Sequence, residues 1–321
     1  MRIYKNSKFL IKNVKVIPRI MKNYFMLILG KKVLKTVEIQ LTDQCQCKCI
    51  HCSFSATEKK SKKCVSFDSI KKFVDDCISL GAFHFNITGG EPLLSEDIFR
   101  LIKYIKDKKN IVSVATNGIL LTKETCTKLK ESGLDIIEIS LDSTKESDHD
   151  KFRGKEGCFE KALQGVIYSK EANITVILNT VIRHERIRNG DLDKMVELVE
   201  KENILLNLNM ACAIGKWKKD YSVLLNQTEK KYVDKLLKHP LVRCDYMSNY
   251  FKKGCAAGSE KITITPYGDI IPCPFINVAF GNVKDKSTKN IWNKMLCNSY
   301  FNKVNKACLP SEDKEFINKY I

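Results

Sequence analysis

Apolar positions divide residues 37–210 into six predicted strands that alternate with five predicted helices. Continuous apolar runs predict buried strands at residues 37–42, 84–88, 111–116, 135–141, 174–182 and 204–210. Apolar residues spaced three or four positions apart predict helices at residues 66–80, 96–106, 123–132, 159–172 and 192–201. This order predicts an α/β fold with a right-handed parallel sheet, either open or curled into a partial (β/α)6 barrel. Ligand sites would then lie at the carboxyl ends of the strands.

The pattern changes on both sides of this region, so we expect three parts: residues 1–36, 37–212 and 213–321. The pattern of the last part predicts a small α+β module, with helices at 228–238 and 287–304 and a β-hairpin at 261–274.

Residues 1–36 carry ten Lys or Arg and no acidic residue, with apolar residues between them. They predict a basic amphipathic helix that lies on a membrane or binds an acidic peptide. The alternative is a helix that packs across the bottom of the next domain with its lysines in solvent.

Charge and cysteine content narrow the function classes. The net charge of +18 predicts attraction to anions, but no nucleic-acid recognition motif is visible, so nucleic acid is not expected as a partner. No cleavable export signal is recognisable, so the expected location is cytoplasmic, with possible attachment to a membrane surface. In such a chain, 14 cysteines indicate metal binding or catalysis rather than disulfides.

A three-cysteine loop follows the first predicted strand. Cys45, Cys49 and Cys52 have the spacing C-x3-C-x2-C. Thiolates suit iron–sulfur clusters, and three ligands on one loop leave a fourth iron open to a substrate or cofactor. A zinc site is the alternative, because Cys47 can complete a set of four ligands.

A second motif ends the next strand, at Gly89, Gly90, Glu91 and Pro92. Its glycines let the backbone approach a ligand, and its carboxylate can receive an ammonium group. With both motifs in place, residues 37 to about 210 resemble the radical S-adenosylmethionine (SAM) superfamily.

This resemblance implies a partial barrel with a 4Fe–4S cluster on Cys45, Cys49 and Cys52, with Cys47 outside the cluster and His51 in the usual aromatic position. The open iron would chelate the amino and carboxylate groups of SAM, and residues 89–91 would line its methionine end. Reduction by a donor such as a flavodoxin or ferredoxin would cleave SAM to a 5′-deoxyadenosyl radical, which abstracts hydrogen from the substrate.

Later strand ends carry further motifs of this resemblance. Ser140 and Asp142, followed by a run that ends in Arg153, resemble the peptide-modifying branch, where the serine and arginine contact SAM. Asn117 ends the third strand and is a further cofactor-binding candidate. The alternative roles are a turn residue for Asn117 and a helix cap for Asp142.

The C-terminal part resembles a truncated SPASM or "twitch" auxiliary-cluster domain. Cys255, Cys273 and Cys308 match its first cysteines, but Ser311 replaces the next one. The resemblance implies one auxiliary 4Fe–4S cluster, whose fourth ligand is Cys244, Cys297 or the substrate. The alternative is a degenerate module with buried free thiols.

The remaining cysteines receive other roles. Cys212 follows the sixth strand and is a candidate catalytic thiol that returns a hydrogen atom to a substrate radical. Helical positions predict packing roles for Cys64, Cys77, Cys126 and Cys158.

These features favour a radical SAM enzyme that acts on a ribosomal peptide or protein. One alternative is a radical SAM enzyme acting on a small molecule, such as an aminoglycoside or a cofactor precursor. The other is a non-enzymatic zinc or iron–sulfur binding module.

Overall fold

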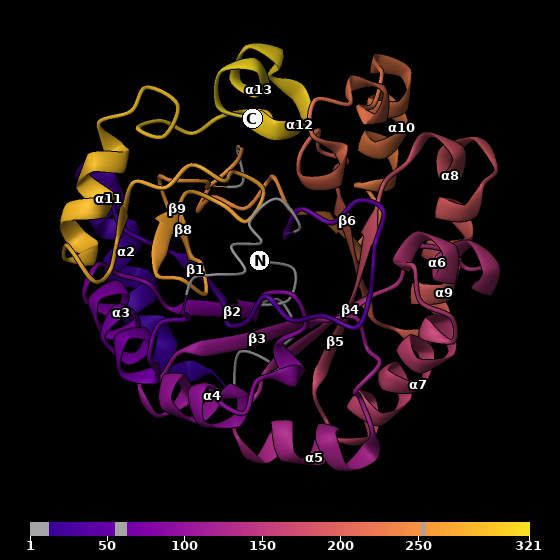
Figure 1. Ribbon diagram of the computed structural model, residues 1–321, viewed down its shortest axis with the longest axis horizontal. Helices are drawn as coiled ribbons and strands as arrows, with labels where there is room; N and C mark the ends of the chain where they lie inside the picture. The colour runs from indigo at the N-terminus through magenta and orange to yellow at the C-terminus, as the bar shows by residue number, and fades with distance from the viewer. Residues whose placement is uncertain (1–12, 55–62, 252–253) are drawn as a thin grey trace.

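The computed structural model describes residues 13–54, 63–251 and 254–321. Its centre is one continuous curved sheet in the order β10-β9-β8-β1-β2-β3-β4-β5-β6-β7, with helices around the outside (Figure 1). The strands from β8 to β7 run parallel, and β9 and β10 are antiparallel additions. The strands are β1 (Thr36–Gln40), β2 (His84–Thr88), β3 (Ile111–Thr116), β4 (Ile136–Ser140), β5 (Thr175–Val181), β6 (Leu205–Asn209), β7 (Val242–Cys244), β8 (Lys261–Ile264), β9 (Asp269–Ile271) and β10 (Gly281–Asn282).

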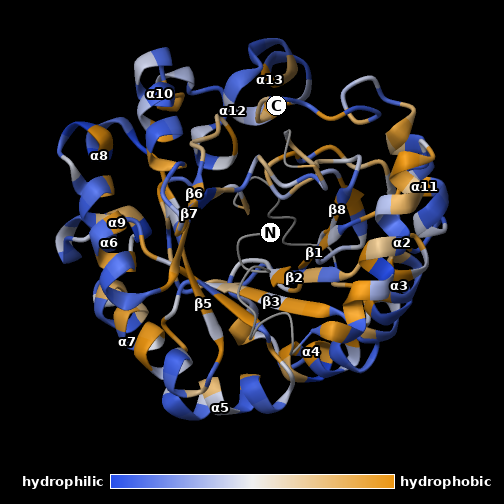
Figure 2. Ribbon diagram, turned by 180° about the vertical axis from the view of Figure 1, so that it is seen from behind, coloured by the Kyte–Doolittle hydropathy of each residue, from blue (hydrophilic) through white to orange (hydrophobic). Residues whose placement is uncertain are grey.

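The helices cover the outer face of the sheet and bury their apolar sides against it (Figures 1 and 2). In α3, for example, Ile70, Phe73, Val74 and Cys77 are buried, and the Ser66 side chain caps the first turn by accepting from Ser69 N at 3.2 Å. The α-helices are α2 (Ile17–Ile28), α3 (Phe67–Ser79), α4 (Ile98–Asp107), α5 (Lys123–Glu131), α6 (Glu146–Arg153), α7 (Cys158–Glu171), α8 (His184–Arg188), α9 (Asp191–Glu202), α10 (Gln227–Leu236), α11 (Thr288–Leu296), α12 (Leu309–Glu312) and α13 (Lys314–Tyr320).

The predicted α/β fold and parallel β/α order are confirmed, but the inner face of the sheet differs from the prediction. The strands alternate: Val37 and Ile39 face the helices, whereas Glu38 and Gln40 face the barrel lumen. Because only the outer face is covered by helices, the inner face keeps polar side chains that a two-sided parallel sheet would not. The prediction of continuously apolar strands was therefore wrong.

The structure also differs from two predictions for the C-terminal part of the chain. The predicted hairpin forms as β8 and β9, but β8 pairs in parallel with β1, so this region extends the barrel sheet. The predicted helix 287–304 ends at Leu296 as α11, and the side chain of Asn298 then accepts from Tyr300 N in a turn. The boundary at residue 212 between two domains stays a prediction.

Helix α2 lies across the amino-terminal end of the barrel. Asn23 is buried there and donates to Gly81 O at 2.7 Å and to the Tyr250 hydroxyl at 2.6 Å. This contact matches the packing interpretation of the basic segment, whose residues 1–12 lie outside the described part of the chain. The outer side of α2 leaves Met21, Phe25 and Ile28 between 61% and 76% exposed. Over the described residues, no helix is long and apolar enough to cross a membrane.

Candidate active site

The three-cysteine loop lies at the carboxyl end of the barrel, directly after β1. Lys48 N donates to Arg153 O and Ile50 N donates to Phe152 O, both at 3.0 Å. These backbone bonds tie the loop to the end of α6, a helix that the sequence analysis did not predict. The position of the loop therefore depends on a segment about a hundred residues away in the chain.

Cysteine thiols gather on the inner side of this loop. The Cys47 thiol lies within hydrogen-bonding reach of Cys45, Cys49 and Cys158. Sequence reasoning placed Cys47 outside the cluster and gave Cys158 a packing role. Both thiols lie beside the expected cluster ligands, and whether Cys47 stays outside the cluster remains a prediction. Cys158 is buried, as a packing role requires, but it packs against this loop. Cys158 is the first residue of α7, and neither spacing nor periodicity connects it with a loop so far away in the sequence.

Two of the predicted ligands lie where the thiolate form is favoured. A hydrogen bond from Cys47 lowers the pKa of Cys45 to about 6 and that of Cys49 to about 7. Asn117 Nδ2 also lies 3.8 Å from Cys45 Sγ, and Arg153 Nη1 lies 3.9 Å from Cys49 Sγ. Iron binds the thiolate, so these contacts suit cluster ligands. Cys52 is half-buried on the same loop, and its backbone N donates to Cys49 O at 3.4 Å.

The Gly89–Pro92 segment packs against the start of the cysteine loop. Gly90 N donates to Thr42 O at 2.8 Å, and Glu91 N donates to Gln44 O at 2.7 Å. A Cβ at Gly90 would lie 2.2 Å from Gln44 O, and one at Gly89 would lie 2.4 Å from Thr42 O. The glycines are therefore required by the close approach of two backbone segments, in addition to any approach to a ligand.

The Glu91 side chain connects the Gly89–Pro92 segment to the end of β3. Its carboxylate is fully buried and accepts from the Thr116 hydroxyl (2.8 Å), Asn117 N (2.8 Å) and Leu93 N (3.1 Å). Burial raises the pKa of Glu91 to about 7 against the opposing effect of these donors. All three donors belong to the chain itself, so Glu91 fixes the ends of β2 and β3. Whether this carboxylate also receives an ammonium group stays a prediction.

Asn117 is a turn residue that also reaches the cysteine loop, and its role in cofactor binding stays a prediction. Its Oδ1 accepts from Ile119 N at 2.9 Å, as expected for a turn residue, while its Nδ2 reaches the cysteine loop at Gln46 Oε1 (3.2 Å) and Cys45. Ser140 ends β4 and pairs in register with Asn179 of β5. Both residues thus lie at the carboxyl end of the barrel.

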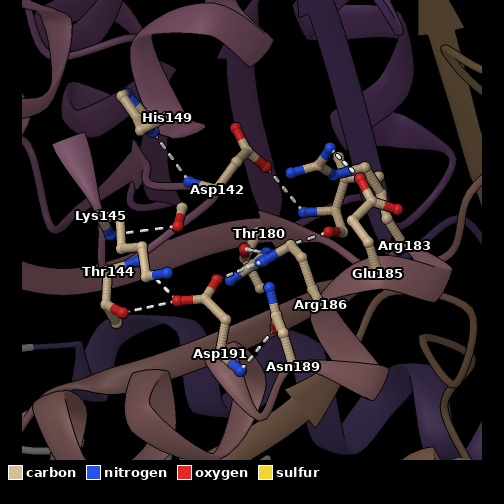
Figure 3. A network of polar contacts seen from close by, with 12 residues as sticks. Asp142, Thr144, Lys145, His149, Thr180, Arg183, Glu185, Arg186, Asn189 and Asp191 are labelled. Atoms are coloured by element: carbon tan, nitrogen blue, oxygen red, sulfur yellow. Dashed lines mark hydrogen bonds and ion pairs between the residues drawn. The ribbon is translucent and has the colours of Figure 1, made fainter. Parts of the chain in front are cut away.

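Asp142 and Arg153 meet each other in a buried ion pair. Arg153 Nε and Nη2 lie 2.6 and 2.5 Å from Asp142 Oδ2. Asp142 Oδ1 accepts from Val181 N at 2.9 Å, and Asp142 N donates to His149 Nδ1 at 3.0 Å (Figure 3). Burial opposes ionisation of Asp142, but Arg153 overrides it and holds the pKa of that carboxyl below its usual value. Because Nε and Nη2 are used by Asp142, Arg153 presents Nη1 to Cys49.

A second buried ion pair supports the first, and the sequence analysis did not detect it. Arg186 Nε lies 2.7 Å from Asp191 Oδ2, and its Nη1 donates to Val181 O at 3.1 Å (Figure 3). Asp191 Oδ1 accepts from Thr144 N at 2.9 Å. Val181 therefore joins the two pairs, which together fix the ends of β4 and β5.

Aromatic rings cover the outer side of the cysteine loop. His51 stacks on Phe152 at 4.4 Å with an interplanar angle of 5°, and Trp217 lies 5.8 Å from His51. Burial, followed by the nearby Arg153, lowers the pKa of His51 to about 3, so the ring is neutral at physiological pH. Sequence reasoning identified His51 but missed Phe152 and Trp217.

The barrel encloses a cavity of about 300 Å³ near the amino-terminal ends of its strands, at the end away from the cysteine loop. Charged and polar side chains line this cavity together with apolar ones: Glu38, His84, Glu138, Arg243 and Lys261, with Ile136, Leu237, Val242 and Met247. Among the described residues, the buried atoms Gln40 Oε1, Asn179 Oδ1 and Thr263 Oγ1 have no hydrogen-bond partner. Each of these residues lies on a strand of the barrel. Unpaired buried polar atoms are unusual in proteins, so these three atoms are candidate contacts for a bound group, although none of the three residues lines the cavity.

The C-terminal cysteines lie together in the interior. Cys255, Cys273 and Cys308 are buried, and Lys261, which is 4% exposed, lies next to Cys255 and Cys273. Cys212 is also buried, with its thiol donating to Met210 O at 3.3 Å. Of the fourth-ligand candidates, Cys297 is exposed and Cys244 lies beside Tyr246. Whether Cys212 returns hydrogen to a substrate radical stays a prediction.

The donor sets of both sites suit iron–sulfur clusters. Each site offers several thiols and a cationic side chain, Arg153 at the first and Lys261 at the second. In the parts of the chain that are described, no three His, Cys, Asp or Glu side chains converge as the ligands of a single metal ion do. A cluster is wider than one ion and needs its thiolates farther apart.

Comparisons with known proteins agree with this site. A sequence profile of the radical SAM superfamily matches residues 39–199, and one of an iron–sulfur cluster-binding domain, SPASM, matches residues 255–311. An AdoMet-dependent heme synthase of Methanosarcina barkeri is 25% identical over 290 residues, covering 79% of this chain and 80% of that protein. A PqqA peptide cyclase of Rhizobium meliloti is 24% identical over 79% of this chain and 72% of its own length.

Solved structures share the fold. The crystal structure of Streptococcus suis SuiB bound to precursor peptide SuiA superimposes with a TM-score of 0.67 at 16% identity, over 84% of this chain and 67% of that chain. Native anSMEcpe with bound AdoMet gives a TM-score of 0.61 at 18% identity, over 85% of this chain and 83% of that chain. The matched domains imply a 4Fe–4S cluster, SAM and auxiliary iron–sulfur binding. The chain therefore belongs to the radical SAM superfamily and carries a SPASM-type C-terminal domain.

Proposed function

We propose that this protein abstracts a hydrogen atom from a ribosomal peptide or protein substrate during its maturation. When bound, the cluster and SAM supply the 5′-deoxyadenosyl radical for that step. The chain would hold the cluster through Cys45, Cys49 and Cys52, with an electron donor such as flavodoxin or ferredoxin as partner. Asn117 and Arg153 would orient the loop, and Gly89, Gly90, Pro92, Ser140 and Asp142 would shape the SAM site.

The unpaired polar atoms of the lumen carry this proposal. A peptide offers an N–H and a C=O at every residue, and these groups can pair with Gln40, Asn179 and Thr263. Leaving such a buried group unpaired costs about 1–3 kcal/mol, so a substrate that pairs with it gains affinity and a defined orientation. Support also comes from the PqqA peptide cyclase relative and from structures of SuiB and anSMEcpe that contain peptides.

A small molecule such as a cofactor precursor is the second candidate substrate. The alignment with the AdoMet-dependent heme synthase, which extends over 79% of this chain, favours it. The cavity in the barrel is lined by charged and amide side chains together with apolar ones such as Leu237 and Met247, so its lining suits either substrate. The unpaired atoms Gln40 Oε1, Asn179 Oδ1 and Thr263 Oγ1 favour the peptide.

The test compares the two substrates under one set of conditions. Protein reconstituted anaerobically with iron and sulfide is incubated with SAM, dithionite and either a peptide encoded beside its gene or Fe-coproporphyrin III. We expect a mass change in the peptide that requires SAM. Conversion of the tetrapyrrole with the peptide unchanged would replace the first candidate by the second. The isosteric variant Thr263→Val should raise KM for the peptide, because it removes one partner from the lumen.

We also propose that α2 contacts an anionic membrane surface. Val14, Met21, Phe25 and Ile28 form an exposed apolar stripe at helical spacing, and Lys15, Lys22, Lys31 and Lys32 flank it. Apolar insertion together with lysines near anionic headgroups is the arrangement of an interfacial helix.

A further inference from the structure

We propose that Cys212 supplies the fourth thiolate of the auxiliary iron–sulfur cluster, beside Cys255, Cys273 and Cys308. Cys212 lies outside the matched cluster-binding domain, which begins at residue 255. The proposal concerns the cofactor alone, so it stands or falls independently of the substrate.

The first argument is the contact between Cys212 and Cys308. Their thiols lie within hydrogen-bonding reach of each other, although 95 positions of sequence separate the two residues. Both belong to one small buried cluster with Ile214, and Ala213 N donates to Pro310 O at 3.2 Å. The segment after β6 is thus fixed by its backbone to the turn that carries Cys308.

The second argument is the continuity of the thiols beyond Cys308. Cys255 and Cys273 belong to the same buried core, and Gly258 N, three positions after Cys255, donates to Pro272 O, next to Cys273, at 3.2 Å. Cys255 N donates to Asn305 O at 2.7 Å, which holds the first cysteine beside the segment leading to Cys308. All four cysteines are buried, with exposures of 5–8%. Four cysteines are the usual number of protein ligands for a 4Fe–4S cluster.

The third argument is a polar group without a partner at the position where the sequence lacks a cysteine. Ser311 follows Cys308 by three positions, in the turn where Ser311 N donates to Cys308 O at 3.0 Å. Its hydroxyl is buried, and no described residue forms a hydrogen bond with it. A buried hydroxyl without a partner costs free energy, so this position is shaped for a group that the chain itself does not supply. Ser311 stands where the next cysteine is expected but offers no thiol, and the residue after Cys212 is bonded to the same turn through Ala213 N and Pro310 O.

The other candidates for the fourth ligand fit less well. Cys297 is the exposed residue that ends α11. The Cys244 thiol lies beside Tyr246 and Met247 at the end of β7. Cys212 is the described cysteine in direct contact with Cys308.

The test counts iron in protein that cannot bind the SAM cluster. Cys45, Cys49 and Cys52 are replaced by Ala, and the chain is reconstituted anaerobically with iron and sulfide. We expect about four iron atoms per chain in this background. Adding Cys212→Ala should remove the iron or leave about three atoms, with the EPR signal of a three-iron cluster. Cys244→Ala and Cys297→Ala are matched controls that should retain four.

A rescue variant separates ligand loss from misfolding. Adding Ser311→Cys to the Cys212→Ala protein restores a fourth thiol one turn from Cys308, so iron should return to about four atoms. Unchanged iron and an unchanged EPR signal in Cys212→Ala would overturn the proposal. Absence of iron from the background protein would overturn it as well, because no auxiliary cluster would then exist. Failure of Ser311→Cys to restore the iron would also count against it.

Discussion

The buried pair of Asp142 and Arg153 connects the end of β5 with the cysteine loop, through Val181 N and Cys49 Sγ. Asp142 is 0% exposed and the Arg153 side chain is 11% exposed, with nitrogen–oxygen distances of 2.6 and 2.5 Å. Asp142→Ala leaves the guanidinium buried without its counter-charge, which costs about 3–5 kcal/mol. Unfolding entropy for a chain of this length is about 0.7 kcal/mol/K, so the Tm should fall by about 4–7 °C.

The assay is thermal unfolding of Asp142→Ala, Arg153→Ala and the double variant at equal iron content. Removing both partners leaves no buried charge, so the loss in the double variant should be smaller than the sum by about 1–3 kcal/mol. Glu124→Ala, which breaks an exposed pair with Lys128, is the control and should leave the Tm unchanged. The reasoning would be refuted if the losses in unfolding free energy of the two single variants added up to that of the double variant. It would also be refuted by a Tm for Asp142→Ala within about 1–2 °C of wild type, as for a typical surface change.

Three further outcomes are expected. Gly90→Ala should reduce the iron bound at the SAM site, because the added methyl group clashes with the cysteine loop. Gly190→Ala, whose methyl group meets open space, is the control, and equal iron content in the two variants would contradict the account. Burial lowers the pKa of His84 to about 3, so the unfolded chain takes up a proton that the folded one excludes. Wild type should therefore lose up to about 2 kcal/mol more stability than His84→Gln between pH 7 and 5, and parallel denaturation curves would argue against burial. Phe25→Ser should weaken binding to anionic vesicles in a flotation assay, whereas wild-type protein that remains unbound would exclude the membrane contact.

Local signals in the sequence predicted the elements that depend on local physics. Ser66 caps α3 as expected, and the apolar periodicity of α3 and α4 locates their buried faces. By contrast, α6 was not predicted, because Glu146–Arg153 is almost entirely polar and has no apolar stripe. Its stability comes from contacts with the cysteine loop and α7, which periodicity does not reveal.

Contacts between residues that are distant in sequence account for the remaining differences between the predicted and the observed structure. The parallel pairing of β8 with β1 joins residues more than two hundred positions apart, and β7 has only three residues. The contacts of the site also depend on residues that are distant in sequence. Spacing identified Cys45, Cys49 and Cys52, but the approach of Cys158 to Cys47 and of Cys212 to Cys308 arises only when the barrel forms.

The most direct test of the central claim is EPR spectroscopy of the dithionite-reduced, reconstituted protein with and without SAM. If Cys45, Cys49 and Cys52 hold a cluster with one open iron, the protein is brown and its signal shifts when SAM is added. The Cys45→Ala, Cys49→Ala and Cys52→Ala triple variant should lose the component that responds to SAM. A colourless, zinc-loaded protein, or a cluster signal that SAM leaves unchanged, would contradict the account.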